Sequence, residues 1–390
     1  MSNLTIGRRG ALALGAGITA AAAAGSQAQA APEGRRKKKN PKAGKLRFGS
    51  DGRFTVLQFN DTQDGHLTDK RTIELITKAI EREKPNFVVF NGDIINGSPA
   101  SALQVKQAYN NVIAPVEAAK VPWALTFGNH DEDSLKKSGM TETKIMNFLL
   151  GYEHNMNVRD DSVNGHANLM LPIAGRRGRG TAAALWLLDS GRYEEETLDG
   201  QKVEEYTYET LHADQVAWYR EQSMELAKRN GGRPVPGLMW MHIPVWETRF
   251  MWYGSPTDWT DESHAKALVK HQITDPQRNE REYVSQFNSG IYNTVREQGD
   301  VMGIYFGHDH INTYEGNYFG VHLGYAPGTG YGTYGLDGDK KHHLRGCRVF
   351  TLDERKPGEF TTRNLYAKDL GIDVKTVAEV RISEPAPLPF

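Results

Sequence analysis

The sequence predicts an α/β protein in which helices cover layers of β-strands. Two observations indicate this class. Short runs of apolar and β-branched residues, such as 54–59 and 87–90, alternate with segments of helical spacing, such as 73–80. The chain of 390 residues is also long enough to bury a large core, and its 38% hydrophobic residues together with 40 glycines are typical of a globular protein.

The expected elements follow one another in a regular order. The expected strands are 54–59, 87–90, 123–127, 183–188, 238–241, 301–306, 318–323 and 348–352. The expected helices lie in 73–80, 102–116, 212–229 and 284–296, and the helical pattern stops past Val301. The polar segment 190–203 predicts a surface excursion. The segment 249–275 has four aromatic residues and no clean period, and it predicts a long loop.

The first thirty residues have the layout of a signal peptide. Arg8 and Arg9 precede the uncharged stretch 11–24, and Ala28-Gln29-Ala30 is a small-x-small cleavage signal. The apolar stretch is too short to cross a bilayer, which takes about 20 residues. The paired arginines resemble a twin-arginine signal, and an ordinary secretory signal with a basic start is the alternative. We therefore expect an exported protein, periplasmic or extracellular, without a membrane span.

Three further boundaries follow from composition. Residues 31–52 are strongly basic and predict a disordered tether, with binding of envelope polyanions as an alternative role. A single domain is expected over 53–370, and 371–390 would be a C-terminal tail.

The formal net charge of -1 argues against a nucleic-acid-binding domain. The one cysteine, Cys347, excludes an internal disulfide and a cysteine-rich metal cage.

Polar clusters follow five of the expected strands, where α/β sheets place their sites. The clusters are Asp61-Thr62-Gln63, Gly92-Asp93, Gly128-Asn129-His130-Asp131, Met241-His242 and Gly307-His308-Asp309-His310. Together they offer carboxylates, amides and imidazoles in numbers sufficient for two metal ions that share one carboxylate. Nitrogen and oxygen ligands without thiolate suit zinc, manganese, iron or nickel.

The order of these clusters resembles the calcineurin-like metallophosphoesterase superfamily. The pattern of that superfamily is Asp-x-His, Gly-Asp, Gly-Asn-His-Asp/Glu, a lone His and Gly-His-x-His, and four of these five blocks match in full. The segments 186–190, 214–219 and 328–335 are similar to the purple-acid-phosphatase-like branch. The resemblance implies a four-layer αββα sandwich, that is, two mixed β-sheets face to face with helices outside.

The resemblance also implies roles for the residues of the clusters. The first metal ion would be bound by Asp61, Gln63, Asp93 and His310. The second would be bound by Asp93, Asn129, His242 and His308. The ions would be divalent or trivalent, with iron, manganese or zinc favoured. His130 would act outside the metal shell on the phosphoryl oxygen or the leaving group, and Asp131 could orient it, with a turn or helix cap as the alternative for Asp131.

Two departures from the family pattern stand out. Gln63 occupies the position where most members have histidine, and its amide oxygen could still coordinate a metal, as a weaker and harder ligand. Asn96 stands where true purple acid phosphatases have their metal-binding tyrosine. Without that tyrosine there is no reason to expect the purple ferric colour.

The expected function is that of an exported, dinuclear-metal-dependent phosphoesterase. It would hydrolyse a small-molecule phosphate ester by attack of a metal-bridging hydroxide on phosphorus. The alternatives are a phosphodiesterase or nucleotidase on the same site, or a metal-stabilised binding protein without turnover. The sequence leaves the substrate, the metal and the oligomeric state open.

Overall fold

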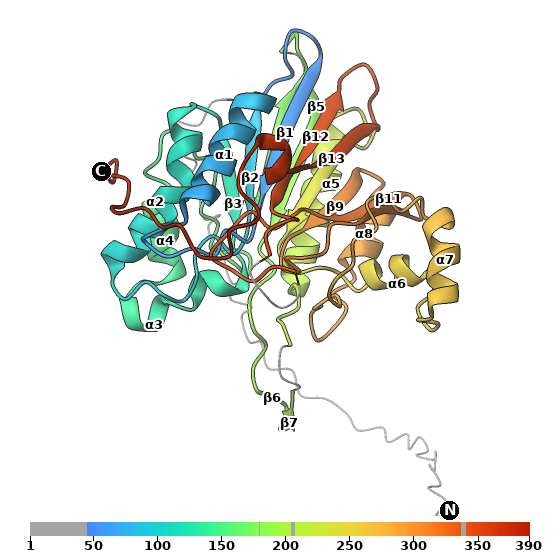
Figure 1. Ribbon diagram of the computed structural model, residues 1–390. Helices are drawn as coiled ribbons and strands as arrows, with labels where there is room; N and C mark the ends of the chain where they lie inside the picture. Colours follow the sequence, from blue (N-terminus) through green and yellow to red (C-terminus); the bar gives the residue numbers. More distant parts are fainter. Residues whose placement is uncertain (1–44, 179, 204–206, 337–340) are drawn as a thin grey trace, which may run out of the picture. The chain divides into compact units, whose positions relative to one another are not determined.

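Two β-sheets form the centre of the protein, and helices lie on their outer faces (Figure 1). The computed structural model describes residues 45–178, 180–203, 207–336 and 341–390. The predicted signal peptide and most of the predicted tether lie outside these ranges. Within them, no helix combines the length and apolar character that crossing a membrane requires.

The first sheet has five strands and is mixed. Its order is β13 (Phe360–Tyr366), β12 (Gly346–Asp353), β1 (Arg53–Phe59), β2 (Phe87–Asn91) and β3 (Trp123–Thr126). The strands β1, β2 and β3 run parallel, whereas β12 is antiparallel to both of its neighbours. The carboxyl ends of β1, β2 and β3 therefore lie at one edge of this sheet.

The second sheet has six strands and is also mixed. Its order is β10 (Glu315–Tyr318), β11 (Val321–Tyr325), β9 (Val301–Phe306), β8 (Gly237–Met241), β5 (Thr181–Leu188) and β4 (Leu169–Ala174). Four neighbouring strands, β11, β9, β8 and β5, run parallel. A separate two-stranded ribbon, β6 (Thr197–Leu198) and β7 (Gln201–Lys202), belongs to the predicted surface excursion.

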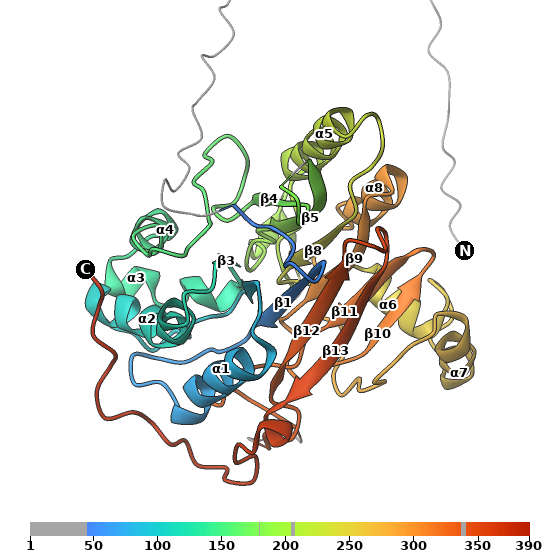
Figure 2. The ribbon, with the colours of Figure 1, turned by 90° about the horizontal axis from the view of Figure 1, so that it is seen from above.

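Each sheet carries its own group of helices, as Figure 2 shows. The helices of the first half of the chain are α1 (Lys70–Glu83), α2 (Ala102–Ala118), α3 (Leu135–Ser138) and α4 (Glu142–Leu149). Those of the second half are α5 (Ala213–Arg229), α6 (Glu247–Tyr253), α7 (Asp261–Lys270) and α8 (Ile291–Gln298). Two short 3₁₀ helices cover Asn129–Glu132 and Ala367–Leu370. The predicted four-layer αββα sandwich is confirmed.

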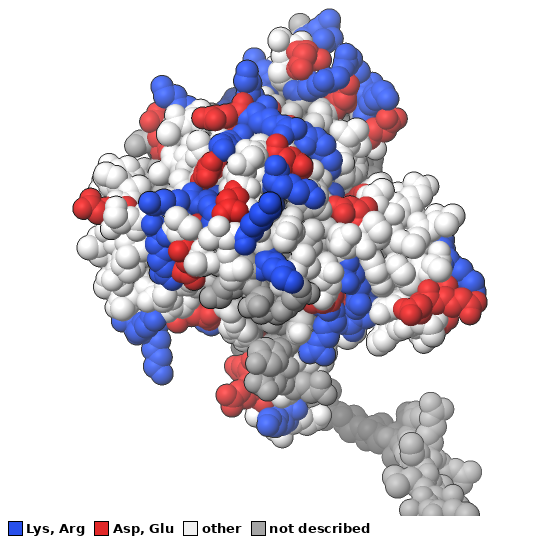
Figure 3. Space-filling view, in the orientation of Figure 1, with Lys and Arg blue, Asp and Glu red and all other residues white. Residues whose placement is uncertain are grey.

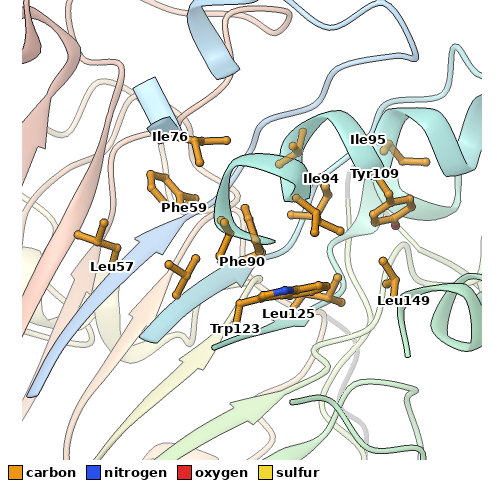
Figure 4. Close-up of a cluster of buried hydrophobic side chains, with 14 of the residues drawn as sticks. Leu57, Phe59, Ile76, Phe90, Ile94, Ile95, Tyr109, Trp123, Leu125 and Leu149 are labelled. Atoms are coloured by element: carbon orange, nitrogen blue, oxygen red, sulfur yellow. The ribbon is translucent and has the colours of Figure 1, made fainter. Parts of the chain in front are cut away.

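Three hydrophobic layers hold these four layers of structure together, and the alternation of side chains along each central strand explains them. In β1, Leu57 and Phe59 pack toward α1, α2 and α4, while Phe54 and Val56 point between the sheets. Figure 4 shows the first of these clusters, with Trp123 of β3 beneath the helices. Strands buried on both faces are apolar at nearly every position, which is why they were visible in the sequence.

Polar side chains link the two sheets close to the carboxyl ends of their strands. Gln58 of β1 donates to the carbonyl of Phe306 at 3.0 Å and accepts from the indole of Trp240 at 3.1 Å. Asn91, at the end of β2, donates to the carbonyls of Met241 and Tyr305. These buried bonds set how the ends of β1 and β2 face the ends of β8 and β9.

Several expected elements need correction. The single strand predicted over 318–323 is a hairpin, because Phe319 (φ 48°) and Gly320 (φ 97°) form a turn between β10 and β11. The long loop predicted over 249–275 contains α6 and α7, joined by Trp252 stacked on His264 at 3.9 Å. The sequence missed β4 and β13, whose patterns are interrupted by exposed residues.

Both predicted boundaries of the domain also move outward. Leu46 and Phe48 are buried, and the Phe48 amide donates to the carbonyl of Ala174, so the packed structure begins within the segment predicted as a tether. The predicted C-terminal tail lies along α1 and α2. Its backbone is bonded to Asp69 and Asn111, and Phe390 packs on Phe148 and Tyr152.

Replacing Asn91 by alanine should destabilise the protein, because the carbonyls of Met241 and Tyr305 would lose their donor inside the core. We expect the free energy of unfolding to fall by about 1–3 kcal/mol for each carbonyl left without a partner. Urea denaturation of the metal-free protein measures it. Asn293→Ala, on the exposed side of α8, is the matched control and should change it by less than about 0.5 kcal/mol. Equal effects would contradict the linking role of Asn91.

Candidate metal centre

The strand ends bring the predicted clusters to one place. Asp61, Asp93 and Asn129 follow β1, β2 and β3 of the first sheet, while His242 and His308 follow β8 and β9 of the second. All five side chains are buried, at 8% exposure or less. The centre therefore lies between the two sheets, at the edge where their parallel strands end.

Two groups of side chains lie close enough to hold a metal ion. Asp61, Asp93 and His310 form one group, and Asp93, His242 and His308 form the other, with ligand atoms in each group within 4.8 Å of one another. Asp93 belongs to both. This sharing matches the arrangement that the sequence predicted, although metal binding by these residues stays a prediction.

Unpartnered atoms show that the centre suits a cation. Asn129 Oδ1, His242 Nε2 and His308 Nε2 are buried and make no well-directed hydrogen bond within the described ranges, although His242 Nε2 lies 3.1 Å from Asp93 Oδ2. His242 Nδ1 lies 2.8 Å from the carbonyl of Asn91, so the Nε2 atom faces the centre. Buried polar groups are costly without a partner, and a bound metal ion would supply one for all three.

The ionisation of the centre points the same way. Burial is the main cause that raises the pKa of Asp61 to about 6; His242 opposes the rise and the Asp93 carboxylate adds to it. Burial also disfavours ionisation of His242, but the neighbouring Asp93 carboxylate outweighs it and raises the pKa of His242 to about 10. A proton on His242 therefore compensates the charge of Asp93 in the metal-free protein. A metal ion would take over this compensation.

The loops that carry the ligands have unusual backbone conformations. Asp61, Gln63, Asp93 and His308 all have positive φ, between 38° and 73°. Residues other than glycine adopt this backbone region at a cost in energy. Such residues concentrate at functional sites. Close packing adds a second constraint, because a Cβ on Gly128 would lie 2.3 Å from Asp93 Oδ1.

Asp131 has a structural role and does not orient His130. Its carboxylate accepts hydrogen bonds from the backbone amides of Asp93, Ile94, Ile95 and Gly128, at 2.8–3.2 Å. The hydroxyl of Tyr109 donates to the same carboxylate at 2.9 Å. Asp131 thus joins the second and third clusters, which is close to the cap role that was the alternative for it.

The residue that orients His130 is Asp133. His130 Nδ1 lies 2.6 Å from Asp133 Oδ2, and the His130 side chain is 37% exposed. Burial lowers the pKa of His130, but Asp133 outweighs it, so the pKa is raised above its usual value. The Arg192 guanidinium pairs with the carboxylates of both Glu132, at 2.5 Å, and Asp133, at 3.4 Å. It therefore restrains the carboxylate that contacts His130. Asp133 follows His130 by three residues, and the 3₁₀ turn Asn129–Glu132 brings the two side chains together, which the sequence pattern did not indicate.

Tyr193 is a second residue that the sequence missed. It lies in the surface excursion before β6, and its hydroxyl accepts from Asn129 Nδ2 at 3.0 Å. The same hydroxyl lies 3.3 Å from His130 Nδ1. Tyr193 therefore turns the Asn129 amide so that its oxygen remains free toward the centre.

Gln63 lies in the centre, but its amide is turned the other way. Gln63 Nε2 donates to Asp93 Oδ2 at 2.8 Å, and Gln63 Oε1 accepts from the hydroxyl of Thr333. In this orientation the amide oxygen, which the resemblance implies as a ligand of the first metal, accepts from Thr333, and the amide nitrogen faces Asp93 instead. Arg249 follows the cluster Met241-His242 in the sequence. Its guanidinium pairs with Glu282, with Arg249 Nε 3.2 Å from Glu282 Oε2.

A family model described as calcineurin-like phosphoesterase matches residues 54–312, a span that contains all the predicted ligands. The chain belongs to this family. The expected resemblance is therefore confirmed, and a hydrolase acting on phosphoester bonds is the activity the family supports.

Several curated proteins are similar to this chain. The chain is similar to two proteins of Arabidopsis thaliana called probable inactive purple acid phosphatase 14 and 29, each 28% identical. The alignments cover 75% of this chain and 74% of the first relative, and 80% of this chain and 80% of the second. The chain is also 25% identical to phosphatase DCR2 of Saccharomyces cerevisiae, over 70% of this chain and 46% of that protein.

Among solved structures, this chain is similar to a dimetal phosphatase from Danio rerio. The alignment covers 80% of this chain and 98% of the Danio rerio chain. The sequence identity is 16% and the TM-score is 0.46.

Replacing Asp93 by alanine should remove bound metal from both sites, because Asp93 is the ligand the two groups share. We expect metal content to fall from about two ions per chain to well below one, since each site would keep an incomplete set. Elemental analysis after reloading and gel filtration measures this content. His310→Ala is the comparison and should cost one ion only. An Asp93→Ala protein that keeps two ions would contradict the assignment.

Proposed function

We propose that this protein is a dinuclear-metal-dependent phosphoesterase that hydrolyses a small phosphate ester. The observation that carries the proposal is the shared position of Asp93 between two buried groups of ligands. Bound metal ions would lower the pKa of coordinated water and neutralise charge on the phosphoryl oxygens. The ligand atoms are nitrogen and oxygen, which favours zinc, manganese or iron.

The protein's own residues would supply the rest of the chemistry. The ligands are buried and restrained, which lowers the cost of ordering the site when substrate binds. His130 stands at the rim with Asp133 behind it, so its Nε2 can face a bound ester. A protonated imidazole there can donate a hydrogen bond to the phosphoryl group, or a proton to the leaving alkoxide.

The word "inactive" in the names of two relatives raises the alternative of a metal-stabilised binding protein. The pairing of His130 with Asp133 beside the buried ligands favours catalysis, because a partly exposed, supported imidazole can serve as a proton donor to a bound ester. The test is turnover of a monoester and a diester after reloading with zinc, manganese or iron. Two ions per chain without hydrolysis of either class would support the binding protein.

The dependence of turnover on the leaving group of the ester should test the role of His130. We expect His130→Ala to keep its metal and to lose about 10²–10⁴-fold in turnover of an alkyl ester, with a smaller loss for an activated aryl ester that needs little protonation. Asp133→Asn should show the same trend more weakly, because it leaves the imidazole in place with less support. Equal losses for both esters would instead indicate binding of phosphate by His130.

Export is also part of the proposal. The paired Arg8 and Arg9, the apolar stretch and the cleavage signal before Ala31 support it. N-terminal sequencing of protein recovered outside the cytoplasm should give a start at Ala31. Replacing both arginines by lysine should block export through a twin-arginine route, whereas an ordinary secretory signal would tolerate the change.

A further inference from the structure

The two amides of the centre are oriented in opposite directions by neighbouring hydroxyls. Tyr193 accepts from the Asn129 amide nitrogen, which leaves the Asn129 oxygen without a partner. Thr333 instead donates to the Gln63 amide oxygen, which leaves the Gln63 nitrogen to face Asp93. An amide nitrogen carries no free electron pair for a metal. The same amide group at two positions therefore presents opposite chemistry to the centre.

Thr333 also contacts His310. Its Oγ1 lies 3.2 Å from His310 Nδ1. Because the single hydroxyl hydrogen of Thr333 is donated to Gln63, the ring nitrogen must be the donor to Thr333. His310 Nε2 is then the unprotonated nitrogen, and it lies 3.5 Å from Asp61 Oδ1. This is the tautomer that a metal ligand requires.

The hydrogen bonds to Asp93 leave room for two ions. A carboxylate offers about four lone pairs, two on each oxygen. The backbone amide of His130 uses one on Oδ1 at 2.8 Å, and Gln63 Nε2 uses one on Oδ2 at 2.8 Å. His242 Nε2 also lies 3.1 Å from Oδ2. As a metal ligand this nitrogen would carry no proton, and one lone pair on each Asp93 oxygen would then remain, enough for one metal on either side.

The turn that carries Thr333 is built to lie against the first cluster. A Cβ on Gly330 would lie 2.0 Å from the carbonyl of Thr62, so only glycine allows this approach. Buried Arg345 donates to the carbonyls of Thr333 and Tyr334 at 2.6 and 2.8 Å. The Tyr334 ring stacks on His310, with ring centroids 4.0 Å apart.

We propose that Thr333 and Gln63 are positioning residues of the metal centre, and that Gln63 is not a metal ligand. The chain of bonds from His310 through Thr333 and Gln63 to Asp93 holds one ligand of the first site and the ligand shared by both. The first site then takes its protein ligands from Asp61, Asp93 and His310. This inference rests on the dinuclear centre of the proposed function.

The experiment measures release of zinc against chelator concentration in the full-length mature protein loaded with two ions. Thr333→Val lacks the hydroxyl. One of its two zinc-release steps should occur at a chelator concentration about 10–100-fold lower than in the wild type. Thr333→Ser keeps the hydroxyl and should stay within about threefold of the wild type. Gln63→Leu should shift both steps, because Asp93 serves both ions.

A zinc-loaded crystal structure provides the second measurement. Gln63 Oε1 at about 2.2 Å from a zinc ion would overturn the inference, as would unchanged release from Thr333→Val. Thermal unfolding of the metal-free variants within a few degrees of the wild type separates these effects from loss of fold. Shifted release without turnover of any ester would overturn the proposed function and leave this inference standing, whereas turnover with unshifted release would do the reverse.

Discussion

The centre depends on the contact between the carboxyl ends of two sheets. Each sheet alone contributes an incomplete set, because the carboxylates come from the first and most imidazoles from the second. The bonds from Gln58 and Asn91 to the ends of β8 and β9 fix this contact inside the core. Apolar packing between sheets tolerates small slides, whereas buried polar bonds without water do not. The polar links therefore set the distances on which metal binding depends.

Much of the fold follows directly from the sequence. The strands that are buried on both faces, such as β1 and β9, are largely apolar and were predicted nearly to the residue. Elements that depend on tertiary contacts were not. The pair α6 and α7 is short and is held by Trp252 against His264, and no period in the sequence signals that contact.

Basic and acidic side chains are interspersed on the face in Figure 3, in keeping with the near-neutral charge of the chain.

The candidate ligands could be predicted because each follows a strand directly. Their supporting residues could not. Tyr193 and Thr333 contact the centre across a large distance in sequence. Asp133 is only three residues from His130, but the two side chains meet because of the local 3₁₀ turn Asn129–Glu132, which the sequence pattern did not indicate. Asp131 shows the opposite error, because adjacency to His130 suggested a partnership that the backbone does not allow. Its carboxylate turns inward to four amides, a geometry that only the folded loops define.

Burial divides the centre into parts with different sensitivities. The ligands are nearly inaccessible and tightly bonded, so a change there alters metal content first. His130, with 37% of its side chain exposed, and Asp133 and Arg192 beside it lie at the rim, where a change would leave the buried groups in place. A relative could therefore keep the fold and its metals and still lose activity through the rim alone. In the proposed function, the buried groups would account for metal binding and the residues around His130 for turnover, so the two can be tested separately.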